Sequence, residues 1–555
     1  MCGIFALLYQ NMDIFDVSLN NSFMLGKKRG PEFSTFTKIN DTTILFGFHR
    51  LAINGLDTIS NQPITKHKTH LICNGEIYNY KQLIEQQRMQ TTTHSDCEVI
   101  SHAYHSLGPQ CVSLLDGVFS FVLYDEIKKQ VMVARDPYGV RPLYMCYYID
   151  GTIGFCSDIE PLLFNKNIQN IYNFPPGTYA LFVAQNSTKW NMIHHERYFF
   201  NTSYILPITS EMKPIEYYMK TFVSYLHKAV KKRVENCERE IASLLSGGLD
   251  SSIISALVHR MYKEKTGHTL ETYSIGLEGA EDLAYARIMS THIGSNHQEI
   301  IVSNEDFIAS IPDVIRHIES YDTTTVRASV GNWNIGKYIA NHSNAKVIFN
   351  GDGSDELTGG YLYFHACKSN EDFHNETLRL LSEINRFDVL RSDKSISSHG
   401  LEPRTPFLDK ELTRFYLSIP IQYRNHNETP NEDGSIVEKY FIRKAIELYD
   451  STLLPHDILW RKKEAFSDGV SSLQKSWYEI IQDHMEIIST SFEHTYEYNT
   501  PNTKEQAYYR HLFEDYFTNH CSTLIPHYWM PNFVENATDA SARSLQLYDT
   551  KSRMD

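Results

Sequence analysis

The feature that most constrains the fold is an alternation of short apolar runs and longer helical patterns that begins near residue 240. Ile241–Leu245 is typical of a buried strand, and the apolar residues between 253 and 261 recur at helical spacing up to Gly267. Three further strands are predicted: one that ends at Ile275, one at Glu299–Val302 and one at Lys346–Phe349. A helix is predicted to end near Ser320. This alternation predicts a mainly parallel sheet with helices on both faces and a ligand crevice at the carboxyl ends of its strands.

The first 200 residues follow a different pattern, in which short strand-like runs are separated by turn residues and helical periodicity is brief. The predicted strands are Ile4–Tyr9, Ile44–Ile53, His70–Cys73, Val118–Tyr124 and Val131–Arg135. Residues 201–214 mix Ser, Thr, Asn and two Pro without a sustained period, which is typical of a connector. We therefore expect a domain at 1–200, a linker at 201–214, a second domain at 215–540 and a loosely held tail at 541–555.

Composition and charge exclude several classes of protein. Of 555 residues, 52 are Lys or Arg and 67 are Asp or Glu, and the formal net charge of −15 gives no overall positive field for nucleic acid. The longest apolar runs, such as Val118–Tyr124, fall far short of the ~20 residues of a membrane span. Nine scattered cysteines without a C-x-x-C pair indicate a reducing compartment. The first residues lack the pattern of a secretory signal, so we expect a cytoplasmic protein without nucleic-acid or membrane partners.

Ser246–Ser252 follows the first predicted strand of the second domain and opens a helix. Its two glycines let the backbone approach an anion closely, and the helix N-terminus adds positive potential. It is not a Walker loop, because the required Lys is missing, and the near match at Gly331–Lys337 is followed by Tyr338 where Ser or Thr is needed. We interpret that near match as part of a helix. The sequence favours a phosphate-binding loop at Ser246–Ser252 over an ordinary glycine-containing turn.

A second glycine-rich loop, Asn350–Glu356, follows the predicted strand Lys346–Phe349. Because parallel strands end at one edge of a sheet, both loops are expected at the same rim. Asp250 and Asp355 are predicted to hold a hard cation there through oxygen ligands, as Mg²⁺ on a triphosphate requires. An isolated acidic loop is more often a solvated turn, and the placement after a strand is what favours the binding role here.

The N-terminus offers a nucleophile. If Met1 is trimmed, Cys2 carries a free α-amine with an expected pKa of ~7.7 to 8.0, close enough to neutrality to act as a general base beside the thiol. A lone cysteine at this place would be read as a small residue at a fraying end. The motifs that follow it along the chain favour the catalytic interpretation.

Four motifs of the first domain together resemble the class II, Cys-nucleophile glutamine amidotransferases. They are Met1–Ile4, His49–Ile53, Asn74–Asn79 and Ser95–Glu98. The resemblance implies that Arg50 offers a fork for the glutamine α-carboxylate, that Asp96 and Glu76 suit its α-ammonium, and that Asn74 and Gly75 stabilise an oxyanion. The catalytic residues it implies in this domain are Cys2, Asn74 and Gly75, and the implied glutamine-binding residues are Arg50, Leu51, Ala52, Ile53, Asn54, Asn74, Gly75, Glu76 and Asp96.

Ser246–Ser252 in turn resembles the pyrophosphate loop of ATP pyrophosphatases, and the two domains in this order resemble the glutamine-hydrolysing asparagine synthetases. The resemblance extends from Met1 to about residue 545. It continues through Tyr321–Ser329, Glu402–Asp409, Arg461–Val470, Tyr528–Pro531 and Asn536–Asp539, the last two being similar to the eukaryotic branch. It implies an α+β, Ntn-type amidotransferase domain of layered sheets and helices, followed by an α/β domain with a mainly parallel sheet.

The same resemblance implies an activity and its site. Glutamine would release ammonia through a thioester on Cys2, and ATP would convert aspartate to β-aspartyl-AMP, which ammonia attacks to give asparagine. The implied ATP-binding residues are Leu244, Ser246, Gly247, Gly248, Asp250, Ser251, Ile275, Asn350, Gly351 and Lys463; the implied aspartate-binding residues are Thr324, Thr325 and Arg327; and Mg²⁺ with ATP would lie at Asp250 and Asp355. Lys463 is selected over its neighbour Lys462 by the motif alone. A homodimer is left open.

The sequence departs from the family pattern at two positions. Where the family usually has Glu, the second glycine-rich loop has Asp352, which we place among the catalytic residues although its side chain is one methylene shorter. Ala366 stands where the family commonly has Lys. Two other hypotheses are a β-lactam-synthetase-like cyclase that does not use glutamine and a non-catalytic relative that binds nucleotide or glutamine. Intact motifs around Cys2 count against the first, and the intact loop Ser246–Ser252 counts against the second.

Overall fold

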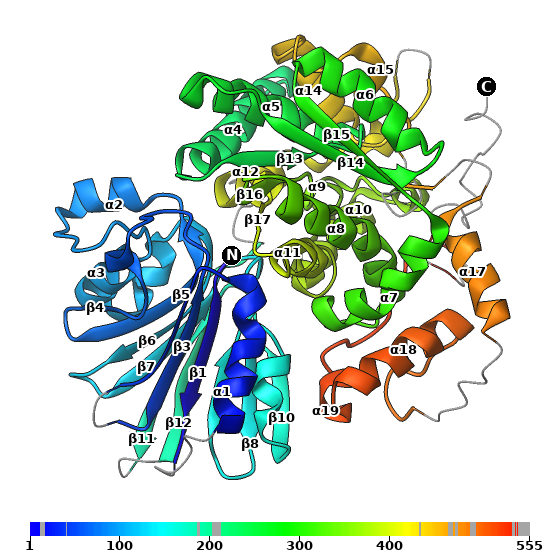
Figure 1. Ribbon diagram of the computed structural model, residues 1–555. Coiled ribbons are helices and arrows are strands. Elements are labelled where there is room, and N and C mark those ends of the chain that lie inside the picture. The colour runs from blue at the N-terminus through cyan, green and yellow to red at the C-terminus, as the bar shows by residue number, and fades with distance from the viewer. Residues whose placement is uncertain are drawn as a thin grey trace.

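The computed structural model describes residues 1–10, 17–39, 42–185, 189–201, 212–431, 434–463, 470–471, 475–488, 496–534, 539 and 541. Residues 202–211 of the predicted linker and 542–555 of the predicted tail lie outside these ranges, as do residues 464–469 and 536–538 of the family-like motifs. Three sheets organise the described chain, two in the N-terminal half and one in the C-terminal half (Figure 1). None of the described helices combines the length and the apolar character that crossing a bilayer requires.

The N-terminal half is built from two antiparallel sheets of six strands each. The first has the order β10 (Ile168–Asn173), β8 (Tyr144–Tyr148), β9 (Ile153–Cys156), β1 (Gly3–Leu8), β3 (Ile44–Arg50) and β2 (Phe33–Lys38). The second has the order β12 (Lys189–Arg197), β11 (Thr178–Gln185), β7 (Gln130–Arg135), β6 (Gly117–Asp125), β5 (Thr69–Ile77) and β4 (Ile64–Lys66). One buried cluster joins their facing sides, with Ile4 and Phe46 from the first sheet and Ile72 and Val122 from the second.

Helices cover the outer faces of both sheets. The α1 helix (Val17–Met24) packs on the first sheet, and α2 (Tyr80–Gln87) and α3 (Glu98–Leu107) pack on the second. The predicted strand Val118–Tyr124 lies within β6, where Phe119 and Phe121 face the helices and Val122 faces the other sheet. A strand covered on both faces is apolar throughout, which explains the unbroken apolar run. The layered α+β class predicted for this half is confirmed.

One predicted strand is too long. Ile44–Ile53 was expected as a single strand, but β3 ends at Arg50. The chain turns there because the Arg50 guanidinium donates to the carbonyls of Asn54, Gly55 and Asp57, which draws the following loop back beside the strand.

The C-terminal half contains a five-stranded parallel sheet. Its order is β15 (Asn296–Val302), β14 (Glu271–Leu277), β13 (Ile241–Leu244), β16 (Val347–Phe349) and β17 (Glu402–Arg404). From β13 the chain adds β14 and β15 on one side, and it then returns to add β16 and β17 on the other side. The strand order therefore reverses between β13 and β16. Pro403 has no N–H to donate, and it fits β17 because that strand lies at the edge of the sheet. The predicted α/β class is confirmed.

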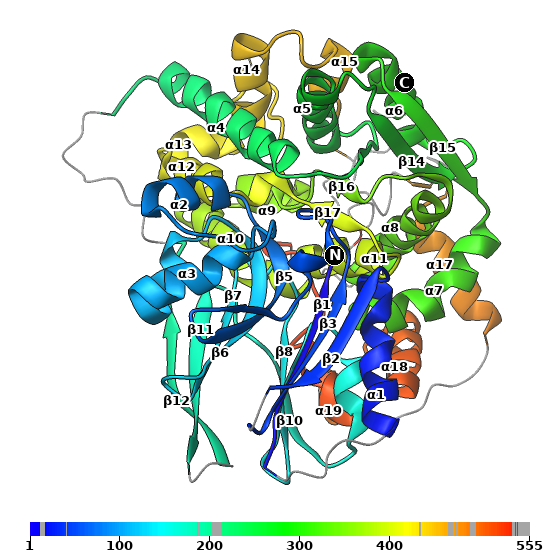
Figure 2. The same cartoon turned by 60° about the vertical axis from the view of Figure 1, so that its left-hand side comes forward.

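Helices lie on both faces of this sheet (Figures 1 and 2). Those that matter for the site are α4 (Ile215–Glu235), α5 (Leu249–Thr266), α6 (Glu281–Ile293), α7 (Asn304–Ile318), α8 (Thr323–His342), α9 (Ser354–Thr358), α11 (Asp388–Ser397), α14 (Tyr440–Tyr449), α17 (Trp477–Ile487) and α18 (Lys504–Tyr516). The predicted end of α5 at Gly267 is confirmed, since this glycine adopts a left-handed backbone. The rejected Walker-like segment lies inside α8, as predicted.

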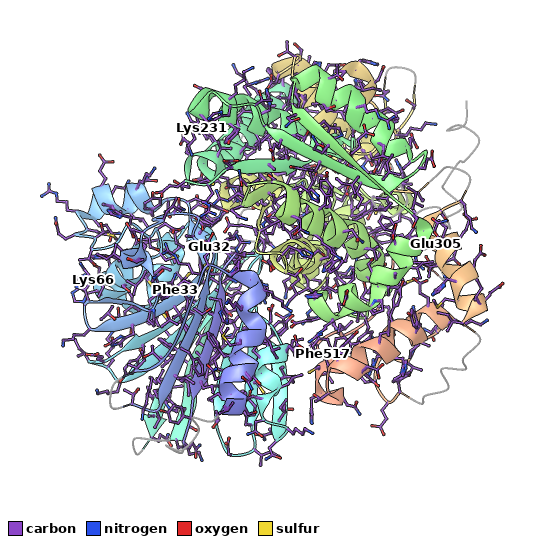
Figure 3. The ribbon with its side chains drawn as sticks, in the orientation of Figure 1. Glu32, Phe33, Lys66, Lys231, Glu305 and Phe517 are labelled. Atoms are coloured by element: carbon purple, nitrogen blue, oxygen red, sulfur yellow. The ribbon has the colours of Figure 1, made fainter. Side chains whose placement is uncertain are left out.

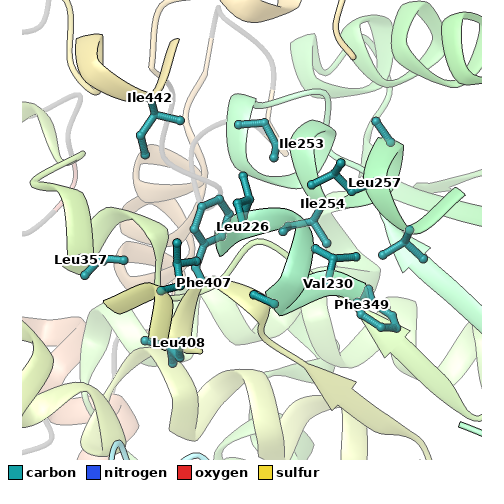
Figure 4. Close-up of a cluster of buried hydrophobic side chains, with 14 of the residues drawn as sticks. Leu226, Val230, Ile253, Ile254, Leu257, Phe349, Leu357, Phe407, Leu408 and Ile442 are labelled. Atoms are coloured by element: carbon teal, nitrogen blue, oxygen red, sulfur yellow. The ribbon is translucent and has the colours of Figure 1, made fainter. Parts of the chain in front are cut away.

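Buried contacts join the two halves. Figure 4 shows part of a core in which Leu226, Ile254 and Phe407 pack together, and the same cluster includes Leu51 and Val118 of the N-terminal half. Glu32, labelled in Figure 3, accepts a hydrogen bond from Arg239 at 3.0 Å across the boundary. The N-terminal amine donates to the carbonyl of Leu401 at 3.5 Å, and both ribbon views place the N-terminus beside α11 and β17.

Candidate functional site

Cys2 lies directly before β1, at the boundary between the two halves. Its half-buried Sγ is 3.5 Å from the Leu51 carbonyl oxygen, and Arg29 donates from Nε to the Cys2 carbonyl at 3.1 Å. Burial raises the pKa of the Cys2 thiol. Burial also lowers the pKa of the Met1 amine to about 6. The general base predicted from the sequence is a different group, the α-amine that Cys2 would carry after removal of Met1, and that role stays a prediction.

Asn74 and Gly75 lie in β5, and Ser157 Oγ links Asn74 to the backbone amide of Ile4, two residues after Cys2. Asn74 is fully buried; its Nδ2 donates to Ser157 Oγ at 3.4 Å, and its Oδ1 has no hydrogen-bond partner among the described residues. A Cβ at Gly75 would come within 2.3 Å of the Val118 carbonyl oxygen, so only glycine fits against β6 at this position. The buried, partly unsatisfied amide is an unusual feature for which a ligand provides an explanation.

Arg50 organises the loop that follows β3. Its NH1 donates at 2.7 Å to both the Asp57 carbonyl and Asn61 Oδ1, and its NH2 donates to the carbonyls of Asn54 and Gly55. These bonds hold the predicted glutamine-binding residues Leu51, Ala52, Ile53 and Asn54 in one buried loop. The structure thus shows the Arg50 guanidinium hydrogen-bonded to this loop. Bidentate binding of the glutamine α-carboxylate by Arg50 stays a prediction.

Two buried carboxylates, Glu76 and Asp96, belong to the same region. Asp96 Oδ2 accepts from the Ile77 amide at 2.6 Å, whereas Glu76 accepts from Asn54 Nδ2 and lies 3.5 Å from Arg404 NH2. Burial raises the pKa of Asp96 to about 6. Burial, with the Asp96 charge as a second cause, raises the pKa of Glu76 well above its usual value. Two buried carboxylates whose ionised forms are destabilised provide a favourable place for an ammonium group.

A second site opens at the carboxyl ends of the parallel strands, between β13 and β16. This is the topological switch point, where ligands bind in such sheets. The cavity there is lined by most of the predicted ATP-binding residues, namely Leu244, Ser246, Gly248, Asp250, Ser251, Ile275, Asn350, Gly351 and Lys463. Gly247 is absent from this lining; it has φ +73°, and a Cβ there would come within 2.5 Å of the backbone of Tyr285 and Ala286. Its role is to let the turn pack against α6.

The two glycine-rich loops touch each other at this rim. Ser354 Oγ donates to Asp250 Oδ1 at 2.7 Å, and a Cβ at Gly351 would come within 2.8 Å of the Asp250 side chain. Asn350 fixes the second loop to α11, because its Nδ2 donates to Ser392 Oγ of that helix at 2.8 Å. The sequence-based prediction that both loops share one rim is confirmed.

Asp250 and Asp355 are brought together by two lysines. Lys439 Nζ lies 2.5 Å from Asp250 Oδ2 and 2.6 Å from Asp355 Oδ1, and Lys463 Nζ lies 2.6 Å from Asp355 Oδ2. Burial raises the pKa of Asp355, but both lysines outweigh it and hold that pKa below its usual range. Sequence reasoning missed Lys439. A Glu-Lys pair at 438–439 in a polar region carries no motif, and only the tertiary contact marks it.

The donor atoms fit the predicted Mg²⁺. Two carboxylates and the Ser354 hydroxyl are oxygen ligands of the kind that this hard cation prefers. Within the described residues no cluster of three or more His, Cys, Asp or Glu side chains could hold a metal ion. The Asp250–Asp355 pair alone offers two carboxylates, and Mg²⁺ often completes such a set with the phosphate oxygens of a nucleotide.

The three residues predicted for aspartate lie in different places. Thr324, at the start of α8, lines the cavity, and its Oγ1 is buried without a hydrogen-bond partner among the described residues. Thr325 donates from its hydroxyl to Asp322 at 2.7 Å, which caps the helix. Arg327 is buried in bidentate contacts with Glu505 of α18 and Asp539, at 2.6 to 2.9 Å, and does not line the cavity. Thr325 and Arg327 thus support the helix that carries Thr324.

Asp352 lines the same cavity between two glycines, of which Gly353 has φ +88°. Its Oδ1 lies 3.7 Å from Arg391 NH2, and its buried Oδ2 has no hydrogen-bond partner among the described residues. Burial raises the pKa of Asp352, and Arg391 opposes the rise. Arg391 and its partner Asp388, 2.6 Å apart, also line the cavity. Sequence reasoning missed this pair because α11 lies far along the chain from both glycine-rich loops.

Comparison with known proteins agrees with this architecture. Residues 1–219 match a family model described as a glutamine amidotransferase domain, and residues 221–373 and 366–541 match one described as asparagine synthase. The chain is 41% identical to "Asparagine synthetase [glutamine-hydrolyzing]" of Gallus gallus and 39% identical to the protein of that name of Homo sapiens, each time over 99% of both chains.

Among solved structures, glutamine phosphoribosylpyrophosphate amidotransferase from B. subtilis matches 50% of this chain and 67% of its own, with 17% identity and a TM-score of 0.29. The full-length relatives and the two domain matches carry the assignment. The chain belongs to the glutamine-hydrolysing asparagine synthetase family.

Proposed function

We propose that the protein converts ATP, L-aspartate, L-glutamine and water to AMP, pyrophosphate, L-asparagine and L-glutamate. The observation that carries the proposal is the pair of glycine-rich loops meeting at the switch point of the parallel sheet, in one chain with a half-buried cysteine at position 2. The first feature suits a triphosphate, and the second suits hydrolysis of an amide.

In the first half of the reaction, Cys2 Sγ attacks the amide carbon of glutamine. The adjacent α-amine accepts the thiol proton, ammonia leaves, and water then hydrolyses the glutamyl thioester to glutamate. The Asn74 Nδ2 group carries two N–H bonds, of which one is directed at Ser157, and we assign the other, with the Gly75 amide, to the oxyanion. Asp96 and Glu76 would receive the α-ammonium of glutamine.

In the second half, a side-chain oxygen of aspartate attacks the α-phosphorus of ATP and pyrophosphate leaves. Ammonia then attacks the acyl carbon of β-aspartyl-AMP, and AMP leaves. Lys463 and the N-terminus of α5 would hold the pyrophosphate oxygens, while Thr324 and Arg391 would orient aspartate beside Asp352. Asp250 and Asp355 would hold Mg²⁺, which offsets phosphate charge when bound.

Ammonia must cross from one site to the other without meeting bulk water. The burial of the N-terminus and its contact with Leu401, just before β17, support an internal route between the two halves. We also propose a cytoplasmic location and small-molecule partners only, with no nucleic acid or membrane. A homodimer is compatible with this function, which needs residues of one chain only.

Pyrophosphate release is the measurement that tests the proposed function. The purified protein should release pyrophosphate only when both ATP and aspartate are present, and it should form asparagine when glutamine or ammonium is added. A cyclase would leave glutamine unhydrolysed, and a non-catalytic relative would release no pyrophosphate under any combination. Either result would remove the assignment.

The raised pKa of Asp96 predicts a pH dependence of glutamine use. If the ionised carboxylate receives the glutamine α-ammonium, protonation below about pH 6 removes that attraction, so the KM for glutamine should rise as pH falls through about 6. Glutamate formation assayed between about pH 5 and pH 8 checks this. Asp96→Asn is the control, because it should have a high KM with little pH dependence. A KM that is constant over this range in the unmodified enzyme would contradict the role of Asp96.

A further inference from the structure

Lys439 combines two features that are rare for a lysine. Its side chain is only 1% exposed, and its backbone has φ +60°, in the left-handed region that non-glycine residues seldom adopt. Both features cost free energy: burying an ammonium removes its hydration, and the backbone conformation is strained. A residue that is both buried and strained persists only where contacts with the surrounding structure offset these costs. Such residues concentrate at functional sites.

The Lys439 ammonium is surrounded by oxygen atoms of three side chains. Nζ donates hydrogen bonds to Asp250 Oδ2 at 2.5 Å and to Ser354 Oγ at 3.3 Å, and it forms an ion pair with Asp355 Oδ1 at 2.6 Å. Gly360 leaves room for the lysine chain, since a Cβ there would come within 2.0 Å of Lys439 Cε. The ammonium therefore occupies the oxygen-lined position between the two carboxylates that would hold a divalent cation.

Lys463 approaches the same carboxylates in a different manner. Its Nζ binds Asp355 Oδ2 at 2.6 Å but stays 3.8 Å from Asp250, and its side chain is 18% exposed. Two lysines and two aspartates thus meet in the lining of the cavity. A divalent cation added between the carboxylates would be repelled by both ammonium groups in a poorly hydrated place, which is unfavourable unless anions arrive with it.

We propose that Lys439 is a built-in counter-ion that keeps divalent metal off Asp250 and Asp355 until a triphosphate supplies the compensating negative charge. Metal and nucleotide then bind as one unit, and the two carboxylates are already oriented when they arrive. The inference rests on the proposed use of this cavity for Mg²⁺ with ATP. It adds a positioning residue whose effect is on metal affinity in the absence of nucleotide.

The test uses Mn²⁺ alone, titrated into the nucleotide-free protein. Its affinity is measured by calorimetry and by the paramagnetic signal of the free ion. Lys439→Met keeps an unbranched side chain but removes the charge, so it should bind one Mn²⁺ at least about 10-fold more tightly than the unmodified protein. Lys444→Met, one turn along α14 in a partly exposed pair with Glu447, is the matched control and should bind as the unmodified protein does.

A second substitution locates the metal. Adding Asp355→Asn to Lys439→Met should remove the Mn²⁺ site, and the single variant should gain more thermal stability from Mn²⁺ than the double variant does, which also reports on folding. Equal Mn²⁺ affinity in the unmodified protein and in Lys439→Met would overturn the proposal, as would tight binding that survives Asp355→Asn. Because no substrate is present, failure of asparagine synthesis in the unmodified enzyme would count against the proposed function and not against this role.

Discussion

Replacing Cys2 with alanine is expected to abolish glutamine-dependent asparagine formation while leaving ammonia-dependent formation largely intact. The thiol is the only group at the N-terminal site that we assign as a nucleophile, so its loss removes thioester formation entirely. The described residues that line the cavity at the carboxyl ends of the parallel strands all belong to the C-terminal half, so the geometry of that cavity should not change. Asparagine is measured with glutamine and with ammonium as alternative nitrogen sources.

The control for this variant is the release of pyrophosphate with ATP, aspartate and ammonium, which should match that of the unmodified enzyme. Cys2→Ser adds a second comparison, because it keeps the size of the side chain but is a much weaker nucleophile. If Cys2→Ala loses the ammonia-dependent reaction to the same extent as the glutamine-dependent one, the assignment of separate chemistries to the two sites is wrong.

Asp352→Ala is expected to lower aspartate-dependent pyrophosphate release by ~10²-fold with glutamine hydrolysis retained. The side chain faces the cavity, and its buried Oδ2 has no hydrogen-bond partner among the described residues, so this carboxylate is placed to meet a ligand. Asp352→Glu should keep a measurable rate, because Glu carries the same charge and is the residue usual in the family. The measurement is the rate of pyrophosphate release at saturating ATP.

Asp352→Asn separates this role from a purely structural one. Asn replaces Asp well in turns, so a residue needed only for the turn between Gly351 and Gly353 would tolerate the change. The Asp352 carboxylate lies 3.7 Å from Arg391, and the neutral amide would remove that charge interaction and any proton transfer. Full synthetase activity in Asp352→Asn would show that this residue is scaffolding.

Local sequence was sufficient wherever one segment carries its own signal. The apolar run at Val118–Tyr124 predicted β6, Gly267 predicted the end of α5, and the rejected Walker-like segment proved helical. Prediction failed at Ile44–Ile53, because the end of β3 is set by hydrogen bonds from Arg50 to a loop that the apolar pattern does not register. Strand propensity reports on a residue and its near neighbours, whereas a turn of this kind depends on a side chain reaching several residues ahead.

For the candidate site, the sequence by itself determined the two domain classes, the two glycine-rich loops and their common rim, because strand-end loops of a parallel sheet must meet at one edge. Only the tertiary structure decided which charged side chains share that rim. In that structure Lys439, which directly precedes α14, contacts Asp250 and Asp355. Arg391 lies beside Asp352. Arg327 is enclosed by Glu505 and Asp539. Pairing of charges over such sequence separations depends on how the helices pack, and packing is a property of the whole fold.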